Sequence, residues 1–202
     1  AMGLKSVRGR DDRLDLYQLD SPQCQVTAKQ AIRAAARASM AIFEENDLEE
    51  GSSPDTYTIK PRFLPLSRYK EPGGNEWCKD EVFVTQARGA VCSGVLIAGA
   101  AGPRILSARH CLGADRAFVF GFAMTDAESP ASFTFSAKDV CRARPGAQVE
   151  VFGELAVLDI ACEGAATVTP ARLAERPLVC SPPCLPEESP EVYAIGYPQY
   201  LP

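Results

Sequence analysis

The chain from Val82 onward is a succession of short apolar runs, and this texture limits its fold more than any other feature of the sequence. Each run has the length of a strand, and Gly, Pro or polar residues bound most of them. Evenly spaced short strands with turn signals between them indicate an antiparallel barrel or sandwich. The runs are VFV, AVCSGVLIA, RILSA, RAFVFGFAM, SFTFSA, QVEVF, LAVLDIA and EVYAIGY.

The segment before Val82 has a different texture. Residues 1–20 are polar, and the Ala-rich stretch TAKQAIRAAARASMAIFEEND follows. Its apolar residues recur at helical spacing and Thr27 is a suitable N-cap, so we expect an amphipathic helix within residues 27–43, with a change to a strand near MAIF as the alternative for its end. Residues 47–76 are rich in Pro, Gly and acidic side chains, which predicts a long surface connection.

Eight cysteines and a single histidine occur among the 202 residues. The cysteines are scattered without a CxxC pair, whereas zinc clusters usually show closely spaced Cys and His ligands. The pattern therefore favours a disulfide framework, an oxidising compartment and a secreted or periplasmic protein, with no metal and no cofactor.

Charge and hydropathy argue against two classes of partner, nucleic acid and a membrane. The chain has 21 basic and 26 acidic residues, which gives no electrostatic footprint for nucleic acid. No run of 18 apolar residues occurs, so we expect no membrane span.

The segment CSGVLIAGAAGPRILSARHC, from Cys92 to Cys111, contains the only histidine, His110. Its two ends, CSGVLI and LSARHC, resemble the trypsin-like serine peptidases, and most closely the bacterial V8-like branch related to glutamyl endopeptidases. In that family a strand of the form Cys-Ser/Gly-Gly-x-Leu-Ile leads through a short hairpin to Thr/Ser-Ala-x-His-Cys. GRDDRLDLYQ, WCKDEVFVTQARGAVCSG, FVFGFAM and VYAIGYPQYLP are similar to further family segments, so the resemblance covers residues 9–18 and nearly all of 77–202.

The resemblance implies an all-β fold with an N-terminal helix, built as a trypsin-like antiparallel β-barrel. Residues 1–76 would form an N-terminal arm, helix and loop, and residues 77–165 the first barrel, with His110 as the catalytic base at its rim. Residues 166–202 would form a linker and the start of an incomplete second barrel. A general base must be held within hydrogen-bond reach of the hydroxyl that it deprotonates, and a disulfide at the next residue limits backbone drift there.

The third member of a catalytic triad is an acid that orients the imidazole. The family carries it at the head of a strand reading Asp-x-Ala-Leu/Val-Leu, and aligning LAVL in GELAVLDIAC puts Glu154 in that place. Asp159 is the competing candidate. It lies five residues further on, so in a regular strand the two carboxylates would point to opposite faces and at most one of them could face His110.

The nucleophile is the missing member. In the family it sits in Gly-x/Asn-Ser-Gly, whose backbone amides also form the oxyanion hole, and this motif is absent from the 202 residues. None of the four serines considered lies in a glycine-flanked turn that would expose its hydroxyl beside oxyanion donors. We therefore expect the nucleophile on a separate chain or a C-terminal segment. The serines considered are Ser93, Ser107, Ser181 and Ser189.

The resulting functional hypothesis is a secreted serine endopeptidase that acts on a polypeptide substrate by acyl transfer. This chain would supply His110 as the general base and Glu154 as the orienting acid. A catalytically inactive protease-like module that binds a partner is the alternative, since the serine is missing and the acid is Glu rather than Asp. A disulfide-rich barrel of unrelated function is the third hypothesis.

The eight cysteines are expected to form four disulfides. A short hairpin and the family resemblance together predict the disulfide Cys92–Cys111. Cys141 and Cys162 bracket the acid-bearing strand, and the Pro-Gly turn between them allows the reversal that would bring them together. The remaining pairs are predicted as Cys180–Cys184 and Cys24–Cys78.

Overall fold

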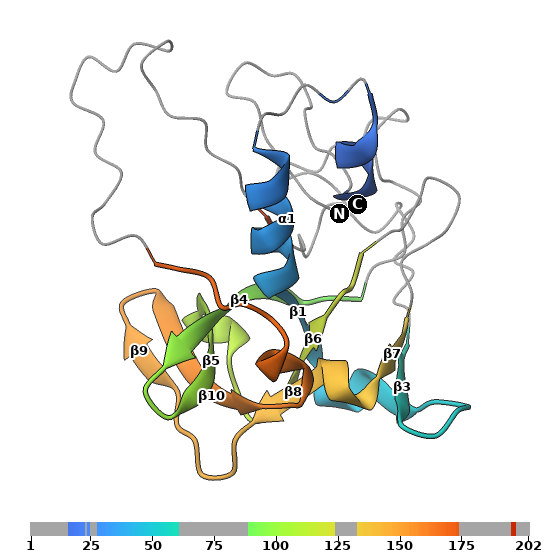
Figure 1. Ribbon diagram of the computed structural model, residues 1–202. Coiled ribbons are helices and arrows are strands. Elements are labelled where there is room, and N and C mark those ends of the chain that lie inside the picture. The colour runs from blue at the N-terminus through green and yellow to red at the C-terminus, as the bar shows by residue number, and fades with distance from the viewer. Residues whose placement is uncertain are drawn as a thin grey trace, which may run out of the picture.

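Six antiparallel strands close into a barrel, which confirms the predicted all-β fold (Figure 1). The computed structural model describes residues 16–22, 24, 28–60, 89–123, 133–173 and 195–196. The strand order is β5-β4-β1-β6-β8-β10, and β10 pairs back with β5. The barrel strands are β1 (Ser39–Glu44), β4 (Cys92–Gly99), β5 (Gly102–Ala108), β6 (Arg116–Phe120), β8 (Val140–Ala143) and β10 (Leu155–Ala161).

A further strand, β9 (Glu150–Phe152), pairs with the first three residues of β10. The last two residues of β10, Ile160 and Ala161, pair with β8. Five 3₁₀ turns link elements of the described chain. They are η1 (Leu16–Asp20), η2 (Glu45–Asp47), η4 (Arg109–Cys111), η5 (Ala137–Asp139) and η6 (Gly164–Ala166).

Alternation along the strands fills the barrel. In β10, Ala156, Leu158 and Ile160 face the interior and are buried. On the opposite face Leu155 is exposed and Asp159 is half-buried, while Val157 between them is buried. This is the period of two that a pleated strand imposes. The fully buried interior residues include Met40, Ile42, Leu96, Ile105, Phe118, Leu158 and Ile160.

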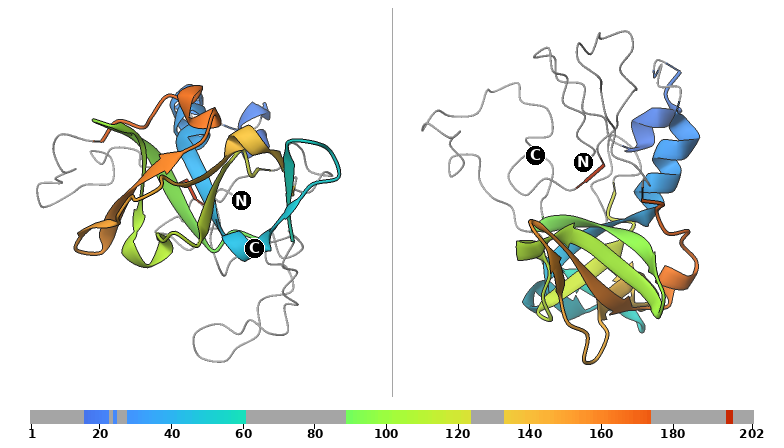
Figure 2. Two further views of the ribbon diagram at one scale, coloured as in Figure 1. Left: turned by 90° about the horizontal axis from the view of Figure 1, so that it is seen from below. Right: turned by 90° about the vertical axis from the view of Figure 1, so that its left-hand side faces the viewer.

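A second, three-stranded sheet lies beside the barrel in the order β2-β3-β7 (Figure 2). It consists of β2 (Leu48–Glu50), β3 (Thr56–Ile59) and β7 (Thr134–Ser136). Its apolar residues pack with β1 and β6 in a separate cluster that includes Phe43, Ile59, Val119, Phe122 and Phe135. The interpretation of residues 47–76 as a surface connection is therefore wrong for β2 and β3, because pairing with the distant β7 lets this polar segment form strands.

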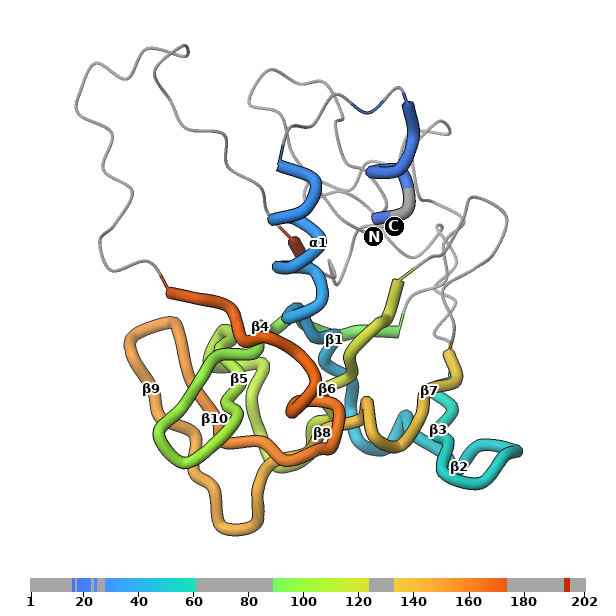
Figure 3. The backbone as a smooth tube through the Cα atoms, in the orientation of Figure 1, coloured from blue at the N-terminus to red at the C-terminus, as the bar shows by residue number. Residues whose placement is uncertain are grey.

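The predicted helix is confirmed as α1 (Lys29–Ala38), with Ala28 rather than Thr27 at the N-cap position. The backbone becomes extended at Ser39, whose hydroxyl donates a hydrogen bond to the carbonyl oxygen of Ala35 at 3.0 Å. The chain then runs directly into β1, as Figure 3 traces.

Strand β1 corrects the predicted limits of the barrel. It pairs with β4 on one side and with β6 on the other, so the barrel begins at Ser39 and is not confined to residues 77–165. Residues 39–43 are all buried, because one face of β1 lines the barrel and the other contacts the small sheet. A strand buried on both faces has no polar alternation that would distinguish it from a helix end.

Several expectations fall on residues outside the described ranges. These are the VFV run, most of the EVYAIGY run and the second barrel. Among the helices that the structure describes, none has the length and the apolar character needed to cross a membrane.

The alternation in β10 gives a matched pair of variants. Leu158 is 1% exposed inside the barrel and Leu155 is 53% exposed on the same strand. Leu158→Ala is expected to lower the free energy of unfolding by about 2–5 kcal/mol, because it leaves a cavity in the core. Leu155→Ala is expected to change it by about 0.5 kcal/mol or less. Urea unfolding followed by circular dichroism measures both, and equal losses would show that the strand faces are assigned wrongly.

Candidate active site

His110 lies at the rim of the barrel, where β5 ends. The backbone is extended at Ala108 and then turns through η4, which contains Arg109, His110 and Cys111. The His110 side chain is exposed, while Cys111 is buried. The imidazole therefore stands at a position that a hydroxyl from outside the barrel can reach.

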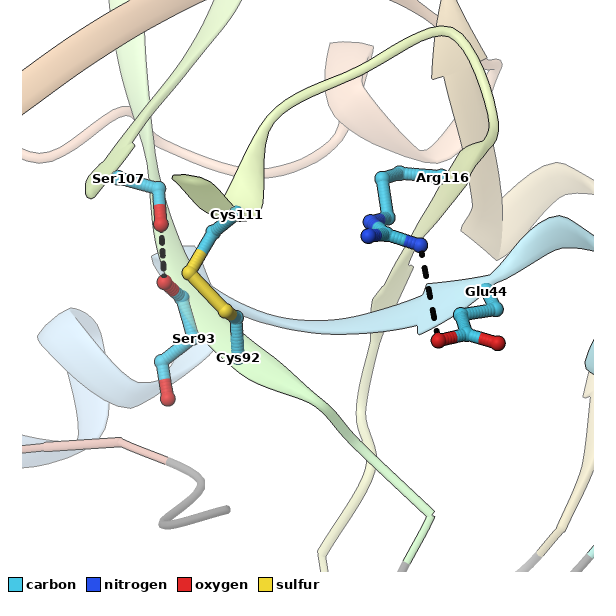
Figure 4. Close-up of a disulfide and its surroundings, with 6 residues drawn as sticks. All are labelled: Glu44, Cys92, Ser93, Ser107, Cys111 and Arg116. Atoms are coloured by element: carbon cyan, nitrogen blue, oxygen red, sulfur yellow. Dashed lines mark hydrogen bonds and ion pairs between the residues drawn. A yellow bond between two sulfur atoms is a disulfide. The ribbon is translucent and has the colours of Figure 1, made fainter. Parts of the chain in front are cut away.

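A disulfide joins η4 to β4, and a hydrogen bond between β5 and β4 lies beside it (Figure 4). The predicted disulfide Cys92–Cys111 is present, with Cα atoms 5.9 Å apart. Beside it, the Ser107 hydroxyl donates a hydrogen bond to the backbone oxygen of Ser93 at 2.6 Å. Ser107 is buried and its hydroxyl is used in this bond, so it contributes to the structure and is not available as a nucleophile.

The imidazole is close to the disulfide. A ring nitrogen of His110 and the sulfur atoms of Cys92 and Cys111 lie within 4.8 Å of one another. Cys and His are metal-ligating residue types, but the ligand form of cysteine is the thiolate. Because the two sulfurs are bonded to each other, this group is a disulfide beside an imidazole rather than a metal site.

Glu154 lies in the turn between β9 and β10. Phe152 pairs with Leu155, so Gly153 and Glu154 form a two-residue hairpin loop. Gly153 has a φ of 65°, which favours glycine at the first position of such a turn. Glu154 thus lies directly before β10, at the junction of loop and strand where the alignment puts it, and strand alternation does not decide where its side chain points.

The pairing of β5 with β10 brings this turn to η4. Leu155 is the partner of Ala108, and the backbone N–H of Arg109 donates a hydrogen bond to the backbone oxygen of Glu154 at 2.9 Å. Arg109 Nε also lies 4.0 Å from Glu154 Oε2. Glu154 and His110 thus occupy the same rim of the barrel, with Arg109 as their shared neighbour.

Asp159 lies elsewhere. It is the register partner of Arg104, and the two form an ion pair in which Arg104 Nε is 2.8 Å from Asp159 Oδ1. Arg104 also contacts Glu150 at 2.6 Å. The hydrogen bond with Glu150 is the largest cause of the raised pKa of Arg104; burial opposes it, and the charges of Glu150 and Asp159 add to it.

The strand separates Asp159 from the histidine. Asp159 lies four residues beyond the Leu155–Ala108 pair, or about 13 Å along β10 at ~3.3 Å per residue. Of the two predicted acids, the structure places Glu154 on the rim with His110 and leaves Asp159 paired with Arg104.

Arg109 is the residue that the sequence analysis missed. In the motif of the family that the chain resembles, the position directly before the histidine is variable, and this chain has the cationic Arg109 there. That charge is visible in LSARHC, but its contact with Glu154 depends on the register between β5 and β10, which the sequence does not reveal.

Of the other three predicted disulfides, one is present, one is absent and one lies outside the described residues. The predicted disulfide Cys141–Cys162 is confirmed, with Cα atoms 4.6 Å apart. Cys24 carries a free thiol, so the predicted bond from Cys24 to Cys78 is wrong. The predicted pair Cys180–Cys184 lies outside the described residues.

A cavity of about 970 Å³ lies away from this site, between α1 and residues 167–172. Its described lining is mainly apolar and includes Ala34, Phe120 and Pro170. Neither His110 nor Glu154 lines it. The cavity is therefore not part of the candidate active site.

Comparisons with protein-family models, with curated protein sequences and with solved structures find no match to this chain.

The two disulfides provide a matched test of the site. Their sequence separations are 19 and 21 residues, so the chain-entropy model gives each a stabilisation of roughly 3 kcal/mol. We expect Cys92→Ala/Cys111→Ala and Cys141→Ala/Cys162→Ala to lower the unfolding free energy by similar amounts. Only the first pair should shift and broaden the imidazole NMR signal of His110, because only that bond anchors η4. Equal changes of the signal in both variants would contradict the anchoring role.

Proposed function

We propose that this chain is the base-bearing half of a secreted, trypsin-like serine endopeptidase. The observation that carries the proposal is the rim geometry: the single histidine follows a barrel strand, is anchored by a disulfide at the next residue, and shares its rim with a carboxylate. The two disulfides also support an oxidising compartment.

In the proposed reaction His110 removes the proton from a serine hydroxyl as the oxygen attacks the substrate carbonyl. The imidazolium then returns this proton to the nitrogen of the leaving amine, which breaks the peptide bond and leaves an acyl-enzyme for water to hydrolyse. Glu154 would orient the imidazole and stabilise its positive charge. The serine would come from outside residues 1–202.

The surface around Glu154 supports a second protein segment at this rim. Phe152 and Leu155 form a cross-strand pair beside the turn, and they are 62% and 53% exposed. Val151 on the same hairpin is exposed as well. Apolar side chains that cluster at a candidate site are commonly covered by a partner surface, and a nucleophile-bearing segment would cover these.

A catalytically inactive protease-like module that binds a partner is the second candidate function. The observation in its favour is the absence of a Gly-x-Ser-Gly motif from the 202 residues. The two functions share the fold and the exposed rim, and they differ in whether His110 has a serine to activate.

Substitutions in the chain together with its nucleophile-bearing segment test the proposal. His110→Ala is expected to lower kcat/KM for a peptide substrate by several orders of magnitude, because the general base is lost. Glu154→Gln is expected to cause a large loss as well. Asp159→Asn is the control, since Asp159 is paired with Arg104 away from the rim.

The ranking of the variants decides between the hypotheses. Activity that survives His110→Ala would contradict the proposed base. A larger loss for Asp159→Asn than for Glu154→Gln would move the acid to Asp159. A protein with no activity and no dependence on either residue would favour the binding module.

A further inference from the structure

The two disulfides of the described chain are alike except in what lies beside them. Each joins a buried cysteine to a half-buried one, Cys111 to Cys92 in the first bond and Cys141 to Cys162 in the second. Their sequence separations are 19 and 21 residues. His110 is the single histidine of the chain, and a nitrogen of its ring lies within 4.8 Å of both sulfurs of the first bond.

The second disulfide lies elsewhere in the barrel. Cys92 belongs to β4 and Cys141 to β8, and the strands β1 and β6 lie between β4 and β8 in the sheet. Cys162 lies seven residues beyond Leu155, which pairs beside η4, or about 23 Å along the chain at ~3.3 Å per residue. The protein therefore carries its own control, a disulfide of similar burial and loop length that is remote from the imidazole.

We propose that Cys92–Cys111 is a thiol-exchange site, which an external dithiol opens and for which His110 is the proton donor. A thiolate attacks the sulfur that it can reach, and this is the half-buried Cys92 rather than the buried Cys111. Exchange is faster when the departing thiolate is stabilised, and an imidazolium beside a cysteine stabilises its thiolate. Opening the bond would remove the covalent link between η4 and β4.

The reaction balances with the dithiol as the reductant. One thiolate of the dithiol bonds to Cys92 Sγ while the bond between Cys92 and Cys111 breaks, and the electron pair stays on Cys111 Sγ. The imidazolium gives its proton to that sulfur and becomes neutral. The second thiol of the dithiol loses its proton to solvent and displaces Cys92, which takes up a proton in turn. The dithiol ends as a cyclic disulfide and both cysteines end as thiols.

Among the described residues around this bond, the imidazole is the group whose type titrates near neutral pH. Carboxylates, guanidinium groups and hydroxyls ordinarily keep one charge state between about pH 5.5 and 8.5, whereas imidazoles ordinarily change theirs. The neighbouring charged and hydroxyl side chains, from η4, the β9–β10 turn, β1, β4, β5, β6 and the loop before β6, are Arg109, Glu154, Glu44, Ser93, Ser107, Arg116 and Asp115 (Figure 4).

The initial rates at which the two bonds are reduced in one sample test the inference. Wild type, His110→Ala and Arg109→Gln would be treated with dithiothreitol between about pH 5.5 and 8.5, quenched by alkylation and mapped by mass spectrometry. The thiolate concentration of the reductant affects both bonds alike, so the rate for Cys92–Cys111 divided by that for Cys141–Cys162 isolates the local effect. Both substituted side chains are exposed, and amide NMR spectra would verify that each variant is folded.

In the wild type this ratio is expected to be roughly three- to tenfold higher at the acidic end of the range, because a positive charge at this distance stabilises the departing thiolate. His110→Ala is expected to abolish the pH dependence. Arg109→Gln alters η4 but leaves the imidazole in place, so the dependence should remain.

A ratio that does not vary with pH in the wild type would overturn the inference. A dependence that persists in His110→Ala would overturn it too, and so would one that Arg109→Gln abolishes as fully, since either would assign the effect to something other than the imidazole. Peptidase activity does not enter the measurement, so a negative result leaves the proposed function standing.

Discussion

Five residue pairs join β5 to β10, and this ladder closes the six-stranded barrel. Closure buries the inner faces of both strands and removes two sheet edges that would otherwise be open. The same register places Ala108 opposite Leu155, so that η4 and the β9–β10 turn emerge side by side. The interaction that completes the fold therefore also brings the two parts of the candidate site to the same rim.

Much of the fold follows from local patterns. The runs LAVLDIA and RILSA correspond to β10 and β5, because each alternates between a core face and an outer face. Strand β1 is harder to assign, since Met40 and Phe43 lie on opposite faces that are both buried. Its second face is buried by β3 and β7, which pair with each other although they are far apart in the sequence. Thr58 and Thr134, for example, are paired across a separation of 76 residues. No local pattern contains that contact.

In the candidate site too, local motifs predict some features, whereas others depend on strand pairing. The motif around His110 predicts the disulfide Cys92–Cys111, and alignment of LAVL predicts Glu154 over Asp159. The turn that carries Glu154 and the contact of that residue with Arg109 depend on strand pairing. Glu is one methylene longer than Asp, and Glu154 lies in a hairpin turn rather than within a strand, so strand alternation does not fix the direction of its carboxylate.

Labelling of the complete protein with a fluorophosphonate probe tests the central claim, that His110 is the base of a serine peptidase. The probe reacts with a serine whose hydroxyl is activated by a base. The account predicts that mass spectrometry finds one labelled serine outside residues 1–202 and that the label disappears in His110→Ala. Labelling that is equally strong without the imidazole, or a complete protein that takes no label at all, would contradict it.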